Sequence, residues 1–283
     1  MTQLPTSVPR GTIITITSGK GGVGKTSVVI NLAFSLARLG HRVGILDADF
    51  GLGNVDVLLG LTPQYHLGDY LSGDKSLDEI TIRGPLGISI IPTGSGIRSL
   101  TALGRDQWAQ LSSVIHTISA DLDYLLLDTA AGISDNVVEP LLMAERILVV
   151  TSFEPAAVVD AYALIKIATR AQADKEIGLV VNGARDADEA AAVFRQLDVA
   201  ASRFLQRSLR YYGFVVSDPT VREAALGQRA VVEHAPHGPA SRCFRILASR
   251  LAGLTPLGGQ QKPVRRPQAT IPDVRGRASV RCA

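Results

Sequence analysis

The feature that most constrains the fold of this chain is the glycine-rich stretch TSGKGGVGKTS at residues 17–27. It follows the apolar run TIITIT and precedes a helical pattern, so its glycines occupy a turn between a strand and a helix. Such a turn directs backbone N–H groups at an anion beside the helix N-terminus. The stretch therefore predicts an α/β fold with a phosphate site where the first strand meets the first helix.

Two phosphate-binding patterns fit this stretch at once. Its alternating glycines give G-x-G-x-x-G, and Asp47 ends the next apolar run, roughly where a ribose-binding acid of a dinucleotide site belongs. The stretch also gives G-x-x-x-x-G-K-[ST], which ends in Lys25 and Thr26. Only the second pattern explains these two residues, because such a lysine neutralises the β and γ phosphates and such a threonine ligates Mg²⁺. We therefore predict a mononucleotide loop.

Seven short β-rich runs alternate with longer helical patterns between residues 11 and 254. The runs are TIITITS, RVGILD, GISIIP, YLLLD, RILVVTS, EIGLVVN and YYGFVV. Runs that are apolar on both faces and separated by helix-length segments indicate a mostly parallel sheet with helices on each side. We expect a three-layer α/β fold, with one twisted sheet flanked by helices, over residues 11–254, preceded by an N-terminal extension at residues 1–10.

Charge is unevenly distributed along the chain. The formal net charge is +3, but residues 262–283 hold six cations and a single acid, Asp273, which leaves −2 for residues 1–261. Because nucleic-acid binding requires cations clustered on a folded surface, we expect no direct contact with nucleic acid. Residues 255–283 are rich in Pro, Gly and Arg without an apolar period, a composition typical of a disordered basic tail.

Cysteine content and the length of apolar runs indicate the cellular compartment of the protein. Cys243 and Cys282 are too few for a disulfide framework or a zinc ligand set, which indicates a reducing environment. The first eleven residues lack an apolar signal segment, and no run approaches the roughly 18 apolar residues of a membrane span. We therefore expect a cytoplasmic protein.

Acidic residues end two of the predicted strands. ILDADFG places Asp47 and Asp49 after the second run, and LLLDTAAG places Asp128 after a later one. The carboxyl ends of parallel strands meet at one edge of the sheet, so these carboxylates should lie beside the phosphate loop. A strand-end aspartate in isolation is usually a turn former or helix cap. Three of them around a phosphate loop instead indicate a metal and phosphate site, where Gly132 would let the backbone approach the γ phosphate.

The motifs KGGVGKT, LDADFGLGNVDVLLGL and DTAAGISDNVV resemble those of the MinD/ParA-type deviant-Walker (SIMIBI) P-loop ATPases. More narrowly, they resemble the flagellar-number branch of that family, the FlhG/FleN regulators. The similarity extends through GPLGISIIPTGSG, EPAAVVDAYALIK and DPTVREAALGQRAVVEHAP, and it covers roughly residues 11–254. The first motif is typical of the superfamily, whereas the others favour the flagellar branch.

The resemblance implies slow ATP hydrolysis coupled to dimerisation. Lys25 would neutralise the phosphates, and Asp49 would orient the attacking water. Lys20, which neither phosphate pattern requires, matches the family's signature lysine, which crosses an ATP-sandwiched dimer to the partner's phosphates. The implied catalytic residues are therefore Lys20, Lys25 and Asp49.

The resemblance also implies which residues bind ATP and Mg²⁺. Thr26 and Asp47 would hold the metal, and Asp128, the Walker B acid, would act on it through a water. Asn182 would read adenine, and Asp218 would lie in the loop that closes the base pocket. The implied nucleotide-binding residues are Gly19, Gly21, Gly22, Val23, Gly24, Lys25, Thr26, Ser27, Asp128, Asn182 and Asp218.

Partners follow from the same resemblance. It implies an ATP-bound homodimer and a transcriptional activator of flagellar genes as the binding partner. Relatives often carry an N-terminal D-Q-A-x-x-L-R motif for a signal-recognition-type flagellar GTPase, and MTQLPTSVPRG does not match that motif. Many relatives also end in a membrane-binding amphipathic helix, for which SRCFRILASRLAGL at residues 241–254 is the candidate here. We favour packing of this helix on the sheet, with weak contact at the membrane or the cell pole as the alternative.

Two other functions remain open at this point. A MinD/ParA-type positioning ATPase for division sites, plasmids or other polar cargo would share all these motifs, although the acidic body argues against partitioning of DNA. A P-loop small-molecule synthetase or reductase-component ATPase would share the phosphate loop. The two cysteines argue against the reductase class, because neither lies where a subunit-bridging cluster would need a ligand.

Overall fold

The computed structural model describes residues 11–94, 103–172 and 174–254, so the predicted N-terminal extension and basic tail lie outside the described residues. One eight-stranded sheet crosses the molecule in the order β3-β4-β2-β5-β1-β6-β7-β8, and each pair is parallel except β3 with β4. The strands are β1 (Thr12–Ser18), β2 (Val43–Ala48), β3 (Ile82–Arg83), β4 (Ser89–Ile91), β5 (Tyr124–Ala131), β6 (Arg146–Thr151), β7 (Glu176–Ala184) and β8 (Arg210–Val216).

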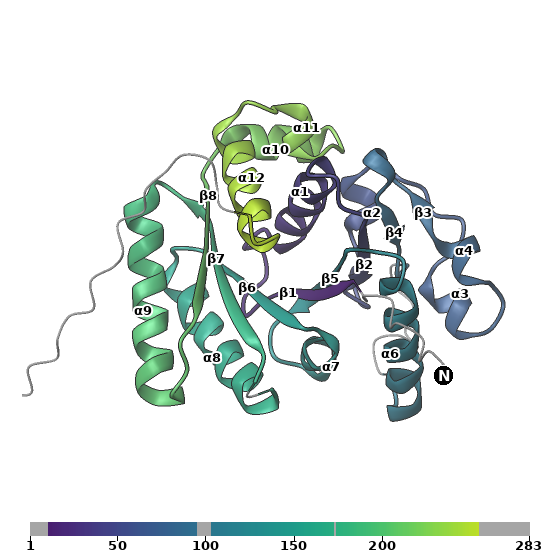
Figure 1. Ribbon diagram of the computed structural model, residues 1–283, viewed down its shortest axis with the longest axis horizontal. Helices are drawn as coiled ribbons and strands as arrows, with labels where there is room; N and C mark the ends of the chain where they lie inside the picture. The colour runs from purple at the N-terminus through teal and green to yellow at the C-terminus, as the bar shows by residue number, and fades with distance from the viewer. Residues whose placement is uncertain (1–10, 95–102, 173, 255–283) are drawn as a thin grey trace, which may run out of the picture.

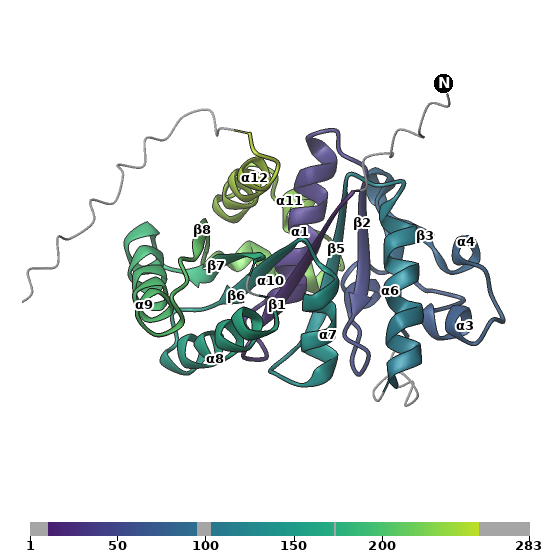
Figure 2. The ribbon, with the colours of Figure 1, turned by 60° about the horizontal axis from the view of Figure 1, so that its bottom comes forward.

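Helices cover both faces of this sheet (Figures 1 and 2). On one face lie α1 (Lys25–Arg38), α10 (Pro219–Leu226), α11 (Val231–His234) and α12 (Pro239–Leu251). On the other lie α6 (Arg105–Ser119), α7 (Asp135–Met143), α8 (Pro155–Ala171) and α9 (Ala187–Leu205). The short elements α2 (Val55–Leu58), α3 (Leu67–Leu71), α4 (Leu77–Ile80) and the 3-10 turn η1 (Pro85–Gly87) fill the connection between β2 and β4. This arrangement confirms the predicted three-layer α/β fold.

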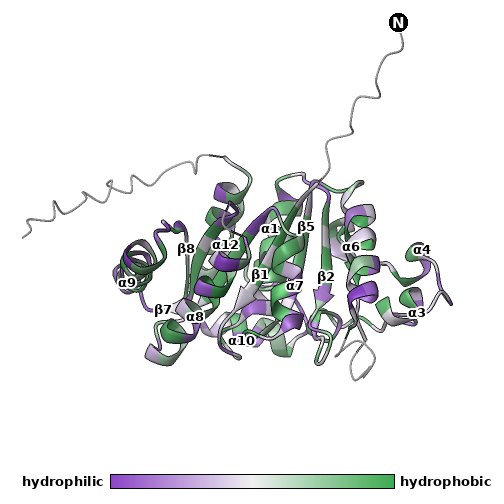
Figure 3. Cartoon of the chain, turned by 90° about the horizontal axis from the view of Figure 1, so that it is seen from below, coloured by the Kyte–Doolittle hydropathy of each residue, from purple (hydrophilic) through white to green (hydrophobic). Residues whose placement is uncertain are grey.

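The strands are apolar on both faces because each face meets a helical layer. In β1, Ile14 and Ile16 pack toward α1, whereas Ile13 packs toward α6. In β6, Leu148 packs on the α1 side and Val149 on the α8 side. Figure 3 shows hydrophobic residues gathered along the central strands, with hydrophilic residues interspersed on α6 and α9.

The C-terminal helix α12 packs into the layer formed with α1. Phe244, Leu247 and Leu251 are buried against the core on that side, and the Arg250 guanidinium donates to the Tyr212 carbonyl at 2.6 Å. The apolar stripe therefore faces the protein, which is the packing that we favoured over a membrane contact. None of the described helices combines the length and apolar composition that crossing a membrane requires.

Candidate functional site

The phosphate loop, residues 19–24, connects β1 to α1 at the carboxyl edge of the sheet. Gly22 and Gly24 have φ angles of 78° and 85°, in the left-handed region that favours glycine. Gly19 lies against the backbone of α8, where an added Cβ would come within 2.2 Å of the Asp160 carbonyl oxygen. No side chain caps the N-terminus of α1. Its first N–H groups are therefore directed at the space that an anion would fill.

Lys25, the first residue of α1, lies inside the protein beside Asp128. Its Nζ is 2.6 Å from Asp128 Oδ1, and both side chains are buried. Burial raises the pKa of Asp128, whereas the ammonium of Lys25 and a hydrogen bond with Thr26 oppose that rise. The loop lysine and the strand-end acid predicted from the sequence therefore meet in one charged pair.

Asp47 lies next to Asp128 across the sheet. The two residues are direct neighbours in the parallel pairing of β2 with β5. Burial, with a smaller contribution from the Asp128 charge, raises the pKa of Asp47 to about 7. Asp49, two residues further on, is half-exposed, and its Oδ1 accepts the N–H of Leu52 at 3.1 Å. The three predicted carboxylates are thus brought to one edge of the sheet.

The carboxylate of Asp47 accepts three backbone N–H groups of the segment that follows it. Oδ1 accepts from Asp49 at 3.1 Å, and Oδ2 accepts from Asn54 at 2.8 Å and Val55 at 3.2 Å. The sequence contained no signal for these bonds, because they depend on the path of an irregular loop. Gly132, after β5, has a φ of 108°, and its N–H donates to the Ser18 carbonyl at 2.9 Å.

The side chain of Lys20 forms an ion pair within its own chain. Its Nζ is 2.5 Å from Glu154 Oε2, in an ion pair whose side chains are 36% and 55% exposed. The residue after Glu154 is Pro155, which opens α8. We did not predict Glu154 as a site residue, because it is 134 positions from Lys20 in sequence. An exposed ion pair of this kind contributes little to stability, so Lys20 can change partners at low cost.

Asn182 and the loop line a cavity of about 300 Å³. The amide Nδ2 of Asn182 donates to the Val23 carbonyl at 2.7 Å, and an added Cβ on Gly24 would meet that amide at 2.3 Å. Asp218 is not among the residues that line this cavity. Its carboxylate caps α10 by accepting the Thr220 N–H at 3.0 Å, and it also accepts the Ala240 N–H at 3.1 Å. The backbone carbonyl of Ser27 accepts a hydrogen bond from the side-chain amide of Asn31 at 2.8 Å.

The residues present fit an Mg²⁺ ion that is held mainly by nucleotide phosphates. Among the described residues no three His, Cys, Asp or Glu side chains form a cluster that could hold a metal on their own. Mg²⁺ usually takes one or two protein ligands and fills its octahedron with phosphate oxygens and water. Thr26 could supply such a ligand. Asp47 and Asp128, whose oxygens already accept hydrogen bonds, could act through water.

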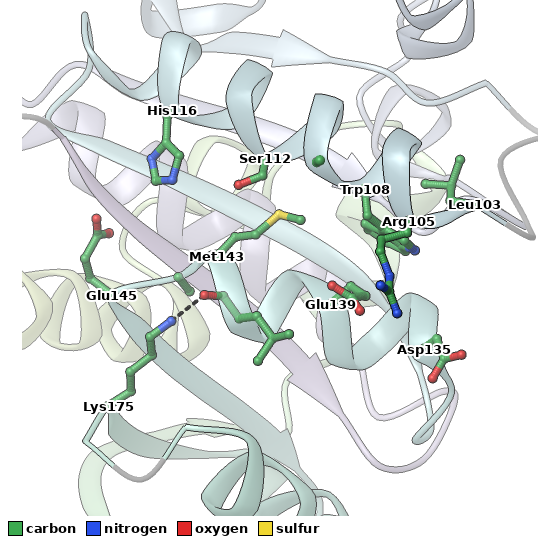
Figure 4. A pocket seen from close by; sticks show the side chains of 13 residues that line it. Leu103, Arg105, Trp108, Ser112, His116, Asp135, Glu139, Met143, Glu145 and Lys175 are labelled. Carbon is green, nitrogen blue, oxygen red and sulfur yellow. Dashed lines mark hydrogen bonds between the residues drawn. The ribbon is translucent and has the colours of Figure 1, made fainter.

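A second cavity, of about 680 Å³, lies between α6 and α7 (Figure 4). Lys175 lines it and donates to the Leu142 carbonyl at 2.6 Å, and Glu145, on the same wall, accepts the N–H of Ile13. These two side chains hold the end of α7 and the start of β1 in place. None of the site residues predicted from the sequence lines this cavity.

Comparison with known proteins identifies relatives over most of the chain. A family model described as ParA, NUBPL iron-transfer P-loop NTPase, matches residues 10–252. The antiactivator FleN of Pseudomonas aeruginosa is 44% identical over 239 residues, which are 84% of this chain and 85% of FleN. The flagellum site-determining protein YlxH of Helicobacter pylori is 32% identical over 255 residues, 88% of this chain and 85% of YlxH.

A solved structure has the same fold. It is the septum site-determining protein MinD of Pyrococcus horikoshii in complex with Mg-ADP, and it superimposes with a TM-score of 0.73 at 24% identity. The match covers 85% of this chain and 96% of the other.

Proposed function

The chain belongs to the ParA family of P-loop NTPases, and from this membership we propose that it is a dimerising ATPase that regulates the number or placement of flagella. The flagellar assignment is supported by two relatives, one named an antiactivator and the other a flagellum site-determining protein. The proposed partner is a transcriptional activator of flagellar genes, which the ATP-bound protein restrains. The proposed location is the cytoplasm.

The observation that carries the ATPase proposal is the buried group formed by Lys25, Asp128 and Asp47 beside the phosphate loop. Thr26 would hold Mg²⁺ directly, and the two aspartates would hold it through water, so that the ion would supply charge neutralisation at the phosphates. The loop N–H groups surround the phosphates. The ammonium group of Lys25 leaves its ion pair with Asp128 and pairs with the phosphates instead. This is catalysis by positioning and charge neutralisation, without a covalent intermediate.

The remaining roles concern the attacking water and the second subunit. Asp49, half-exposed at the start of its loop, orients the water for attack on the γ phosphate. Lys20 leaves Glu154 and reaches the phosphates of the partner subunit, where its charge stabilises the transition state. ATP thereby favours the dimer, and hydrolysis removes the phosphate that holds it together.

The first test is the molecular mass in each nucleotide state. Light scattering should give twice the 30.0 kDa chain mass with ATP and Mg²⁺, and the single-chain mass with ADP and Mg²⁺. Lys25→Ala should stay monomeric in both states, because the phosphates lose their countercharge. Equal masses of the unsubstituted protein in ATP and ADP would refute the switch.

A second test separates the flagellar function from its alternative, the positioning of division sites or other cargo. In a deletion strain the proposed function predicts an altered number of flagella per cell and a normal cell length. Misplaced division with normal flagella would support the alternative. Binding of the purified flagellar activator should require ATP and be lost with ADP.

A further inference from the structure

We propose that Asp47 is a positioning residue, whose carboxylate fixes the loop of residues 49–55 and thereby the water-orienting Asp49. The catalytic part of this inference rests on the proposed ATPase function. The structural part, that the carboxylate anchors the loop, concerns the protein without nucleotide.

The contacts of Asp47 close the loop at both of its ends. Oδ1 accepts the N–H of Asp49, where the loop begins, and Oδ2 accepts the N–H groups of Asn54 and Val55, where it ends. The backbone carbonyl of Asp47 is held as well, by the hydroxyl of Thr93 after β4. One side chain therefore ties the two ends of an irregular segment to the end of a central strand.

Burial makes this arrangement specific. The side chain of Asp47 is 2% exposed, and a buried carboxylate is costly unless hydrogen bonds replace its lost water. The replacement donors are backbone N–H groups of the loop. Asn54, the N-cap of α2, makes no side-chain cap, so Asp47 satisfies N–H groups at the start of this helix. Displacement of the loop would leave these N–H groups and the buried carboxylate without their hydrogen-bond partners.

Gly53 shows how closely the loop approaches the carboxylate. It is buried, and an added Cβ would come within 2.7 Å of Asp47 Oδ2 and 3.1 Å of its Cγ. Its φ lies outside the left-handed region, so space and not backbone conformation requires glycine here. Gly51 is in the same loop and also lies outside that region, but its nearest atom would be Asp49 Oδ1 at 3.8 Å, an ordinary contact.

These two glycines provide a matched pair of substitutions that leave every proposed ligand in place. Gly53→Ala forces the loop away from Asp47, whereas Gly51→Ala adds the same methyl group without a clash. If Asp47 positions Asp49, Gly53→Ala should lower kcat by about tenfold to a hundredfold, because a displacement near 1 Å has that effect on a reacting group. The dissociation constants of ATP and Mg²⁺ should stay within about threefold of the original values, since no proposed ligand is itself substituted.

Hydrogen exchange in nucleotide-free protein measures directly whether the Asp47 carboxylate holds the loop. The amides of Asn54 and Val55 should exchange at least about tenfold faster in Gly53→Ala and in Asp47→Ala, because their acceptor is displaced or removed. Amides of the central strand β5 should exchange as before, which reports that the fold is intact. Gly51→Ala should leave both the exchange rates and kcat unchanged.

Three results would overturn the inference. Unchanged exchange at Asn54 and Val55 in Gly53→Ala would show that the carboxylate does not anchor the loop. Faster exchange with an unaltered kcat would show that the anchor does not position Asp49. A loss of Mg²⁺ affinity in Gly53→Ala as large as its loss of kcat would make Asp47 chiefly a metal ligand. An unsubstituted protein without ATPase activity would refute the proposed function, while the exchange rates would still decide the anchoring.

Discussion

Asn182 contacts the phosphate loop, and we propose that the same side chain also binds the base. Its Nδ2 donates to the Val23 carbonyl, and the residue also lines the cavity beside the loop. In this proposal Oδ1 accepts the exocyclic amino group of adenine, whereas guanine carries a carbonyl oxygen at the corresponding position. The bond to Val23 would then link recognition of the base to the geometry of the phosphate loop.

We expect Asn182→Ala to lower the affinity for ATP more than the affinity for GTP, because only adenine loses a hydrogen bond. The loss of ATP affinity should be about tenfold, close to the value of one hydrogen bond in a protected site. Equilibrium titration with both nucleotides measures the ratio. An equal loss for ATP and GTP would mean that Asn182 only supports the loop and does not read the base.

Glu79 offers a residue-level test of pH dependence away from the phosphate loop. Hydrogen bonds from the Ser76 N–H, from Lys75 and from the Ser76 hydroxyl, in the N-terminal capping box of α4, lower the pKa of Glu79 to about 2 from 4.5. A lowered acid pKa gives stability that is complete above the unfolded value of 4.5 and is lost as the pH falls toward 2.

Glu79→Ala should therefore reduce the free energy of unfolding at pH 7 and have a progressively smaller effect below pH 4.5. Urea unfolding of the variant and of the unsubstituted protein at several pH values gives the difference. A difference that does not change between pH 7 and pH 3 would show that the ionised carboxylate is not what stabilises the cap.

At the scale of elements, helix α12 gives the clearest separation between packing and exposure. Phe244 is 1% exposed against the layer formed with α1, whereas Ile246, on the same helix, is 40% exposed. Phe244→Ala should lower the free energy of unfolding by about 3–5 kcal/mol, through lost burial and the cavity that remains. Ile246→Ala should cost at most about 1 kcal/mol. Denaturant unfolding checks both, and equal small effects would mean that α12 is not docked in solution.

How far elements can be predicted depends on their length and periodicity. The seven apolar runs were correctly predicted as strands because burial on both faces leaves a strong signal in each of them. Strand β3 was missed, since two residues carry no period. The short helices α2, α3 and α4 were missed because segments of four or five residues are also too short to show a period. Their positions follow from the path between β2 and β4, which includes the bonds to Asp47.

The site was predictable to the extent that strand ends determine it. Lys25 and Asp128 were expected at one edge of the sheet, and the structure brings them together. Glu154 and Gly53 could not be found in this way. The contact of Glu154 with Lys20 depends on where α8 begins relative to a loop 134 residues earlier, and the contact of Gly53 depends on an irregular turn.

At the scale of the whole molecule, the function of Lys20 can be tested by mixing two inactive variants. In a mixed dimer of Lys20→Ala and Asp49→Ala, the site in the Lys20→Ala subunit keeps its own Asp49 and receives Lys20 from the partner. Random mixing makes about half of the dimers mixed, each with one working site of two, so ATPase activity should return to roughly a quarter of normal, given a two-fold interface.

The control for this experiment places both substitutions in one chain. A Lys20→Ala/Asp49→Ala chain mixed with Lys20→Ala should stay inactive, because neither site can then receive Lys20. Phosphate release measures the activity, and labelled subunits report exchange. If subunits exchange and the first mixture also stays inactive, Lys20 acts within its own subunit.

The strand order has a consequence for synthesis of the protein on the ribosome. The first strand, β1, pairs with β5 and β6, which begin at Tyr124 and Arg146. More than a hundred residues must therefore be translated before the strand that leads into the phosphate loop gains its first neighbour. At about 5–20 residues per second this takes roughly 5–20 seconds. Until then β5 and β6 cannot pair with the apolar strand β1, so we expect the nascent chain to need the protection from aggregation that ribosome-associated chaperones give.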